Sequence, residues 1–176
     1  MEFEQVIRKR RMIREFDLNK QIPEKTIRKL LRNAHRAPSA GHTQVQEFVI
    51  VTDPATKRKL RQVAVDQEYV EEAPTLIVVC SNTSRSERRY GMRGREFYSI
   101  IDGAFASMLI LLTAVNEGIG AGFVGAFEDD KVSEILKLPR YVRPIGIITL
   151  GYPKEKEPVG RLERLPIEDQ IHVERW

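Results

Sequence analysis

An unusually apolar helix is the strongest constraint on how this chain folds. Residues 96–117 place apolar side chains around nearly the whole helix circumference, so this helix must be covered on almost all sides. Small residues within it, Gly103, Ala104, Ala106 and Ser107, permit the close approach of another helix. A chain of 176 residues can bury one such helix centrally. A second copy related by a two-fold axis is a simpler cover, so we expect a homodimer.

A glycine-rich segment follows this helix. Gly120, Gly122 and Gly125 have the G-x-G-x-x-G spacing, but a dinucleotide site needs a strand before the glycines and a helix after them. Here a helix comes first, and the segment itself alternates small and apolar residues as a strand does. A strand this poor in side chains lets something flat approach its backbone. It predicts either a planar cofactor facing N–H groups near Gly125 and Ala126, or a tight helix-to-strand turn packed on a neighbouring helix.

Helices and buried strands alternate irregularly along the rest of the chain. Helices are expected over residues 2–10, 23–36, 54–63 and 129–138, the last capped by Asp129 or Asp130. Strands are expected over residues 48–51, 76–80 and 145–150, in addition to the glycine-rich one. Residues 81–95 are expected to form a basic loop long enough to be a lid or binding loop. No repeat or boundary is visible, which indicates one α/β layered domain over residues 1–176.

The C-terminal segment, residues 153–176, is charged and interrupted by prolines, so it cannot fold compactly by itself. It nevertheless carries apolar residues, namely Leu162, Leu165, Ile167, Ile171 and Trp176. A solvated tail has little need of these side chains. We expect this segment to wrap the partner subunit, and disorder is the alternative.

Composition narrows the class of protein. Apolar residues make up 41% and charged residues 31% of the chain, no apolar run reaches the roughly 18 residues of a membrane span, and the N-terminus lacks a signal-peptide pattern. A cytoplasmic protein is expected. Cys80 ends an apolar run and is expected to be buried, and the three histidines are too scattered for a metal site.

Basic residues gather in two clusters, within residues 8–14 and within residues 85–95, in a chain of net charge +4. A basic stripe can bind nucleic acid or another polyanion, which leaves a non-enzymatic binding protein as one alternative. Neither cluster is interleaved with aromatic residues beyond Tyr90, and no recognition motif is present. A solvated surface is the simpler interpretation.

Three segments occur together in a characteristic order. Residues 10–16 read Arg-Arg-Met-Ile-Arg-Glu-Phe, residues 37–44 read Ala-Pro-Ser-Ala-Gly-His-Thr-Gln, and the glycine run is followed by Arg143-Pro144 and by Leu-Gly-Tyr-Pro at 150–153. In this order they resemble the FMN-dependent nitroreductase family and cover most of the chain. The resemblance implies a nitroreductase-like α/β (α+β) fold, with a central, mainly antiparallel sheet flanked by helices, in an intertwined homodimer.

The resemblance also implies a set of cationic cofactor ligands. It assigns Arg10, Arg11 and Arg14 to the phosphate, ribityl chain and pyrimidine edge of FMN, with Arg164 or Arg161 completing the phosphate site. Arginine suits this task because its planar fork matches a phosphate dianion. Arg10 and Arg14 lie four residues apart at the end of an expected helix, so one turn could present both. Each of these arginines has the alternative of being a plain surface charge.

The proline-serine loop comes from the second subunit in this family. Carried over, Pro38, Ser39 and Ala40 would contact the flavin, and backbone N–H groups of Gly125 and Ala126 would face its N5 and O4. Donors at that position stabilise the negative charge that reduction places on the ring.

Four further positions bear on the cofactor and the substrate. Met12 stands where the family usually has Ser, and it loses the hydroxyl but keeps the backbone N–H. His42 stands where an Asn often reaches the pyrimidine edge, and imidazole cannot donate and accept as an amide does. Both are expected beside the cofactor, with altered redox properties. Tyr90 or Phe123 would border the substrate face, unless they belong to the core.

The implied activity is an FMN-dependent oxidoreductase that passes hydride or electrons from NAD(P)H to a nitroaromatic, quinone or related acceptor. The cofactor supplies the chemistry, so no catalytic side chain is assigned and ping-pong kinetics are expected. Relatives with other chemistry, such as dehalogenases, enoyl-type reductases or flavin-fragmenting enzymes, are the alternative. The Arg-rich stretch 85–95 is expected to clamp an anionic substrate or the nicotinamide phosphate.

Overall fold

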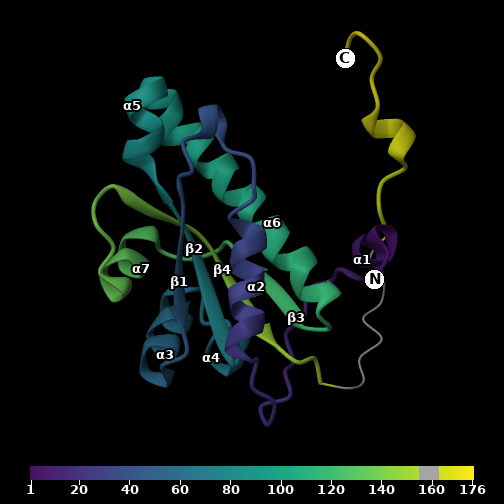
Figure 1. Ribbon diagram of the computed structural model, residues 1–176, viewed down its shortest axis with the longest axis vertical. Coiled ribbons are helices and arrows are strands. Elements are labelled where there is room, and N and C mark those ends of the chain that lie inside the picture. The colour runs from purple at the N-terminus through teal and green to yellow at the C-terminus, as the bar shows by residue number, and fades with distance from the viewer. Residues whose placement is uncertain (155–162) are drawn as a thin grey trace.

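The computed structural model describes residues 1–154 and 163–176. Its centre is a four-stranded sheet in the order β1-β2-β4-β3, in which every neighbouring pair is antiparallel. The strands are β1 (Gln46–Val51), β2 (Thr75–Asn82), β3 (Gly120–Val124) and β4 (Val142–Gly151). Helices cover both faces of this sheet (Figure 1). The expected α+β fold with a mainly antiparallel sheet is confirmed.

Strand β2 explains why both faces need covering. All eight of its residues are buried, as expected for a continuous run of β-branched and apolar side chains with helices on both sides. Ile77 and Val79 point into one hydrophobic cluster, whereas Leu76, Val78 and Cys80 belong to the other. Successive side chains of a strand point to opposite faces, so one strand supplies both cores.

The two cores are closed by different helices. On one face lie α2 (Glu24–Ala34) and α6 (Ser99–Asn116), which bury side chains such as Leu30 and Ile110. On the other lie α3 (Pro54–Val63), α4 (Glu68–Glu72) and α7 (Asp129–Leu136), with Leu60, Val70 and Val132. Asp53 caps α3 by accepting the backbone N–H of Thr56 at 2.8 Å. Helix α7 differs from expectation, because its N-cap is Glu128 and no side chain caps it.

The expectation of a loop over residues 81–95 is wrong. Residues Thr83–Arg93 form helix α5, and a π-helical turn, η2 (Gly94–Tyr98), joins it to α6. Gly91 interrupts the helical geometry with a φ of 59° and a ψ of −148°. Gly94 lets the turn approach α5, because a Cβ there would lie 2.4 Å from the carbonyl oxygen of Ser86. Tyr90 and Tyr98 then pack edge to face, with ring centroids 5.1 Å apart.

The long apolar helix is only partly covered by the chain itself. The stretch Thr83–Asn116 is long and apolar enough to cross a membrane, and half of its most apolar window is buried inside the fold, as in the central helix of a folded domain. Phe97, Phe105 and Met108 remain 48%, 46% and 48% exposed. Helix α1 (Phe3–Lys9), which contacts α6, exposes Phe3 and Ile7 as well.

The described part of the C-terminal segment projects from the body of the molecule (Figure 1). It contains one short 3-10 turn, η3 (Ile167–Gln170), and all of residues 163–176 are exposed. Its apolar side chains lie in solvent in the single chain, with Leu165 71% and Trp176 101% exposed. Leu162 lies outside the described residues.

Candidate functional site

The arginine-bearing segment runs along the outer edge of strand β3. Helix α1 ends at Lys9, and residues 10–15 continue outside any helix or strand, held by the backbone N–H of Ile13, which donates to the carbonyl of Ala121 at 3.0 Å. Arg10 and Arg14 therefore do not share a helical turn, which corrects the expectation.

Close packing accounts for two of the three spaced glycines. A Cβ on Gly122 would lie 2.7 Å from the Cε of Met12, and one on Gly120 would lie 2.8 Å from the Cγ2 of Ile13. The flat object that approaches these glycines is thus the chain's own N-terminal segment. Neither alternative describes these two positions, because the glycines pack against a non-helical segment rather than a neighbouring helix, and no cofactor is needed to explain them. Met12 lies against β3 in the region that the resemblance assigned to the flavin.

The third glycine differs, because nothing in the chain closes over it. Gly125 and Ala126 follow the end of β3 and are exposed. Within the residues that the structure describes, neither backbone N–H donates a hydrogen bond. A Cβ on Gly125 would meet only the ring of Phe123, at 3.3 Å. Two adjacent unpaired donors at a strand end suit an acceptor from outside the chain.

Phe123 borders this position. Its side chain is directed over Gly146, where an added Cβ would overlap the ring, and the residue is 38% exposed. Its ring therefore has an open face beside Gly125. Of the two aromatic candidates for the substrate side, Phe123 keeps this surface. Tyr90 is half-buried and packs on Tyr98.

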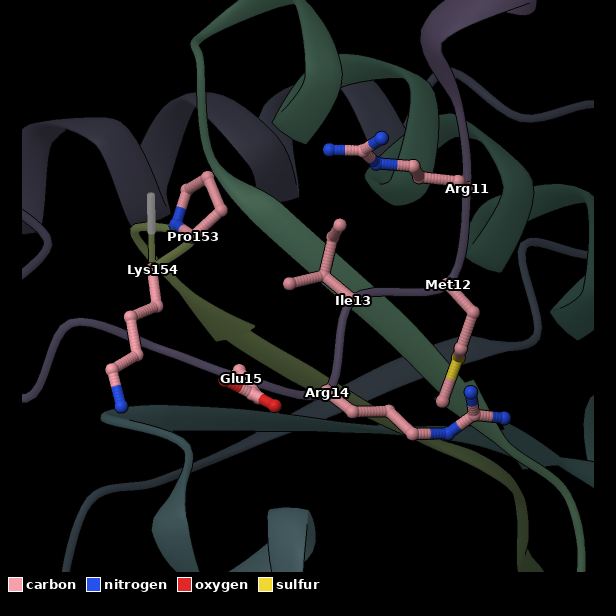
Figure 2. A pocket seen from close by; sticks show the side chains of 7 residues that line it. All are labelled: Arg11, Met12, Ile13, Arg14, Glu15, Pro153 and Lys154. Carbon is pink, nitrogen blue, oxygen red and sulfur yellow. The ribbon is translucent and has the colours of Figure 1, made fainter. Parts of the chain in front are cut away.

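A shallow hollow of about 200 Å³ lies beside the arginine segment. Figure 2 shows the side chains that line it, among them Arg11, Met12, Ile13, Arg14 and Pro153. Small-molecule sites usually enclose about 300–1,000 Å³, so this hollow by itself does not enclose a flavin. Arg10 is half-buried outside it. Arg14 is exposed, with its guanidinium 5.6 Å from the ring centroid of Tyr69.

The proline-serine loop lies away from the arginines in the single chain. It follows the C-terminal end of α2, beside α5, whereas the arginine segment pairs with β3 (Figure 1). Pro38 is exposed, and the 3-10 turn η1 (Ala40–His42) follows. The hydroxyl of Ser39 accepts the backbone N–H of Gln44 at 2.9 Å, and the Nε2 atoms of His42 and Gln44 are 3.1 Å apart. One chain thus does not bring the two halves of the expected site together.

The arginines of residues 85–95 mostly bind the chain itself. Arg85 and Arg89 donate to loop carbonyls, Arg95 pairs with Glu87, and Arg93 donates to the hydroxyl of Tyr98. Among described residues only Arg88 in this cluster forms no ion pair or side-chain hydrogen bond. These contacts leave little of the cluster for an anionic ligand.

Two buried titratable groups remain. Burial raises the pKa of the Cys80 thiol to about 12, which disfavours the reactive thiolate. Burial also raises the pKa of the Asp102 carboxyl, opposed by a hydrogen bond from the backbone of Ala40. Sequence reasoning missed Asp102, although the only acid between Glu96 and Glu117, inside an apolar stretch, was the available signal. Within the described residues no His, Cys, Asp or Glu cluster could hold a metal ion.

Two assigned arginines lie in the C-terminal segment. Arg164 is exposed and forms no ion pair or hydrogen bond with described residues. Arg161 lies outside the described residues. The completion of a phosphate site by either one stays a prediction.

Known proteins resemble this chain in sequence and in fold. An NADH dehydrogenase of Thermus thermophilus is 32% identical over 194 residues, covering 91% of this chain and 90% of the relative. An FMN reductase (NADPH) of Bacillus subtilis is 27% identical over 175 residues, covering 92% and 69%. A crystal structure of a nitroreductase family protein from Clostridium novyi matches with a TM-score of 0.79 and 31% identity, covering 88% of this chain and 87% of that one.

The family model described as the nitroreductase family matches residues 7–71 and 62–152, which together make up most of the chain. The matched region contains the arginine segment, the proline-serine loop and the glycine-rich strand. This protein belongs to the nitroreductase family.

Proposed function

We propose that this protein is a flavin-dependent NAD(P)H oxidoreductase that uses FMN and reduces a nitroaromatic, quinone or related acceptor. The observation that carries the proposal is the edge of β3. Met12 packs on Gly122, which precedes the unpaired N–H donors of Gly125 and Ala126 by three residues or more. The segment that carries the arginines and these backbone donors therefore lie along the same edge of the sheet. Relatives named as an NADPH-dependent FMN reductase and an NADH dehydrogenase support the electron donor and the cofactor.

The residues at this edge fit FMN. Within the described residues, Arg10, Arg11 and Arg14 form no side-chain hydrogen bonds or ion pairs, so they can bind a phosphate dianion and the polar ribityl chain. The N–H groups of Gly125 and Ala126 supply donors for the polar edge of the ring, where they stabilise negative charge. Met12 would line the same region, in place of the family's usual hydroxyl.

A homodimer would complete the site. The loop with Pro38, Ser39 and Ala40 lies away from the arginines of its own chain, so a second copy must bring a loop to them. The exposed Phe97, Phe105 and Met108 supply apolar surface for such a contact. The projecting segment with Leu165 and Trp176 would wrap the partner, burying side chains that a monomer leaves in water.

The proposed chemistry assigns separate roles to the cofactor and to the protein. When bound, FMN would supply the redox chemistry, taking a hydride from the nicotinamide and passing electrons to the acceptor. The chain's arginines would bind and orient the cofactor, its backbone donors would stabilise negative charge, and Phe123 would flank the open side used by donor and acceptor in turn. Within the described residues no metal cluster is available, and the buried Cys80 thiol is not poised to act as a nucleophile.

The test is reconstitution. Purified protein is incubated with FMN, desalted, and examined for flavin absorbance, for molar mass by light scattering, and for NADH and NADPH oxidation with quinone and nitroaromatic acceptors under anaerobic conditions. The proposal predicts a yellow dimer with parallel double-reciprocal plots. A colourless protein that oxidises neither nucleotide would overturn it.

A further inference from the structure

A buried carboxyl holds the proline-serine loop from inside the protein. Asp102 lies in the first turn of α6 and is only 2% exposed. Its Oδ1 and Oδ2 lie 3.1 and 3.2 Å from the backbone nitrogen of Ala40, which donates to them. A carboxyl is expensive to bury without compensating hydrogen bonds. Among described residues the partner of Asp102 is this loop, so its burial is linked to the position of the loop.

Two arginines hold the same loop from outside. Arg89 donates from Nη1 to the carbonyl of Gly41 at 2.6 Å, and Arg85 donates from Nη1 to the carbonyl of Gln44 at 2.7 Å. Arg85 is itself fixed by an ion pair with Glu47 at 2.8 Å. Hydrogen bonds from a charged donor are stronger than neutral ones. The loop is thus tied at three backbone groups by three charged side chains.

The backbone conformation shows why such ties are needed. Gly41, His42 and Gln44 have φ values of 54°, 58° and 48°, in the left-handed region. Residues other than glycine persist there only where their surroundings hold them. A Cβ on Gly41 would lie 2.6 Å from the Nε of Arg89, so glycine at this position also lets the arginine approach.

We propose that Asp102, Arg85 and Arg89 are positioning residues that fix the proline-serine loop, residues 37–44, in the conformation in which it contacts the flavin. This inference rests on the proposed function. The three side chains act through backbone groups and leave the exposed Pro38 available at the surface. A loop ordered in advance loses less conformational entropy when the cofactor binds, so these ties strengthen FMN binding without touching FMN.

The experiment uses the full chain in three sets. Arg89→Ala and Arg89→Lys test the outer ties, Asp102→Asn and Asp102→Ala test the inner tie, and Ser107→Ala and Arg88→Ala are matched controls on the same two helices. Ser107 donates only to Gly103 within α6, and Arg88 has no tie to the loop. FMN affinity is measured by quenching of flavin fluorescence, and the flavin's surroundings by visible circular dichroism.

Arg89→Ala and Asp102→Ala are expected to weaken FMN binding about tenfold and to change the visible dichroism of bound FMN. Arg89→Lys keeps a donor and Asp102→Asn keeps an acceptor. Their FMN affinities are therefore expected to lie between those of wild type and the alanine variants. The controls are expected to match wild type. Asn preserves the volume at position 102, and position 89 is exposed, so these variants keep the fold even if Asp102→Ala does not.

Wild-type affinity and dichroism in Asp102→Asn and Arg89→Ala would overturn the positioning role while leaving the proposed function intact. Equal losses in the controls would also overturn it, because the effect would then not depend on the ties. Failure of the wild-type chain to bind FMN is a different result, which contradicts the proposed function itself.

Discussion

The two halves of the proposed site are held in place by different kinds of interaction. The arginine segment is fixed by a backbone hydrogen bond from Ile13 and by packing of Met12 on a glycine, which leaves its charged side chains uncommitted. The 37–44 loop is fixed by charged side chains, Asp102, Arg85 and Arg89, acting on its backbone. Substitutions of the packed residues in the first region should therefore affect stability, whereas substitutions of its free arginines and of the polar ties in the second region should affect cofactor affinity.

The largest expected effect is at Gly122. Gly122→Val adds side-chain atoms where the Cε of Met12 and the Oγ1 of Thr149 would lie 2.7 and 2.8 Å from a Cβ. Overpacking of this kind lowers the free energy of unfolding by about 1–3 kcal/mol. Urea denaturation measures it. Gly122→Ala with Met12→Ala should recover part of the loss seen in Gly122→Ala alone, and an equally unstable double variant would contradict the packing account.

The next effect separates binding from stability in the arginine segment. Arg14→Ala removes an exposed charge that forms no ion pair, so the free energy of unfolding of the apo protein should change by less than about 0.5 kcal/mol. FMN affinity should fall about tenfold or more, because a charge-assisted hydrogen bond to phosphate is lost. Fluorescence titration against Arg88→Ala as the control tests this. Unchanged FMN affinity would make Arg14 a plain surface charge.

Ionic strength should distinguish the two regions by a smaller change in FMN affinity. The phosphate contacts of Arg10 and Arg14 would be partly exposed, so raising ionic strength should weaken FMN binding in wild type. Arg14→Ala should flatten that dependence, whereas Arg89→Ala should leave its slope unchanged. The measurement is the FMN dissociation constant over a salt series. Equal slopes in all three proteins would remove the distinction.

The smallest expected effect is a pH dependence at the loop. Burial raises the folded-state pKa of Asp102 above its ordinary 3.8, so folding favours the protonated form. The stability that Asp102 contributes is therefore complete below pH 3.8 and is lost as the pH rises through the folded-state pKa. Wild type should lose stability relative to Asp102→Asn over that interval. A wild-type advantage that grows with pH would have the wrong sign.

The sequence predicted those elements whose apolar pattern is local. Strand β2 is a continuous buried run, and α6 is an apolar stretch too long for a strand, so both were found close to their observed bounds. Helix α5 was missed because it is polar and contains Gly91, and the residues that it contacts lie in the 37–44 loop and in η2. Local propensity carries no information about such contacts.

The sequence suggested which residues belong to the candidate site, but it did not show how these residues are packed and held. The segment with the arginines pairs with β3, which ends just before Gly125, but Gly120 and Gly122 serve packing by Met12 and Ile13, which lie more than a hundred residues earlier. A glycine pattern does not reveal which object lies against it. The ties from Asp102 and Arg89 to the loop are likewise long-range, and a single sequence contains no sign of them.

Mixed dimers test most directly whether two chains share each flavin site. One chain carries Arg10→Ala and Arg14→Ala, and the other carries Ala40→Trp in the loop, so that neither homodimer retains FMN after desalting. If arginines and loop come from different subunits, each mixed dimer contains one intact site and should recover one tightly bound FMN. If both halves belong to the same chain, every site in the mixed dimer is defective, and the absence of recovered flavin would contradict the account.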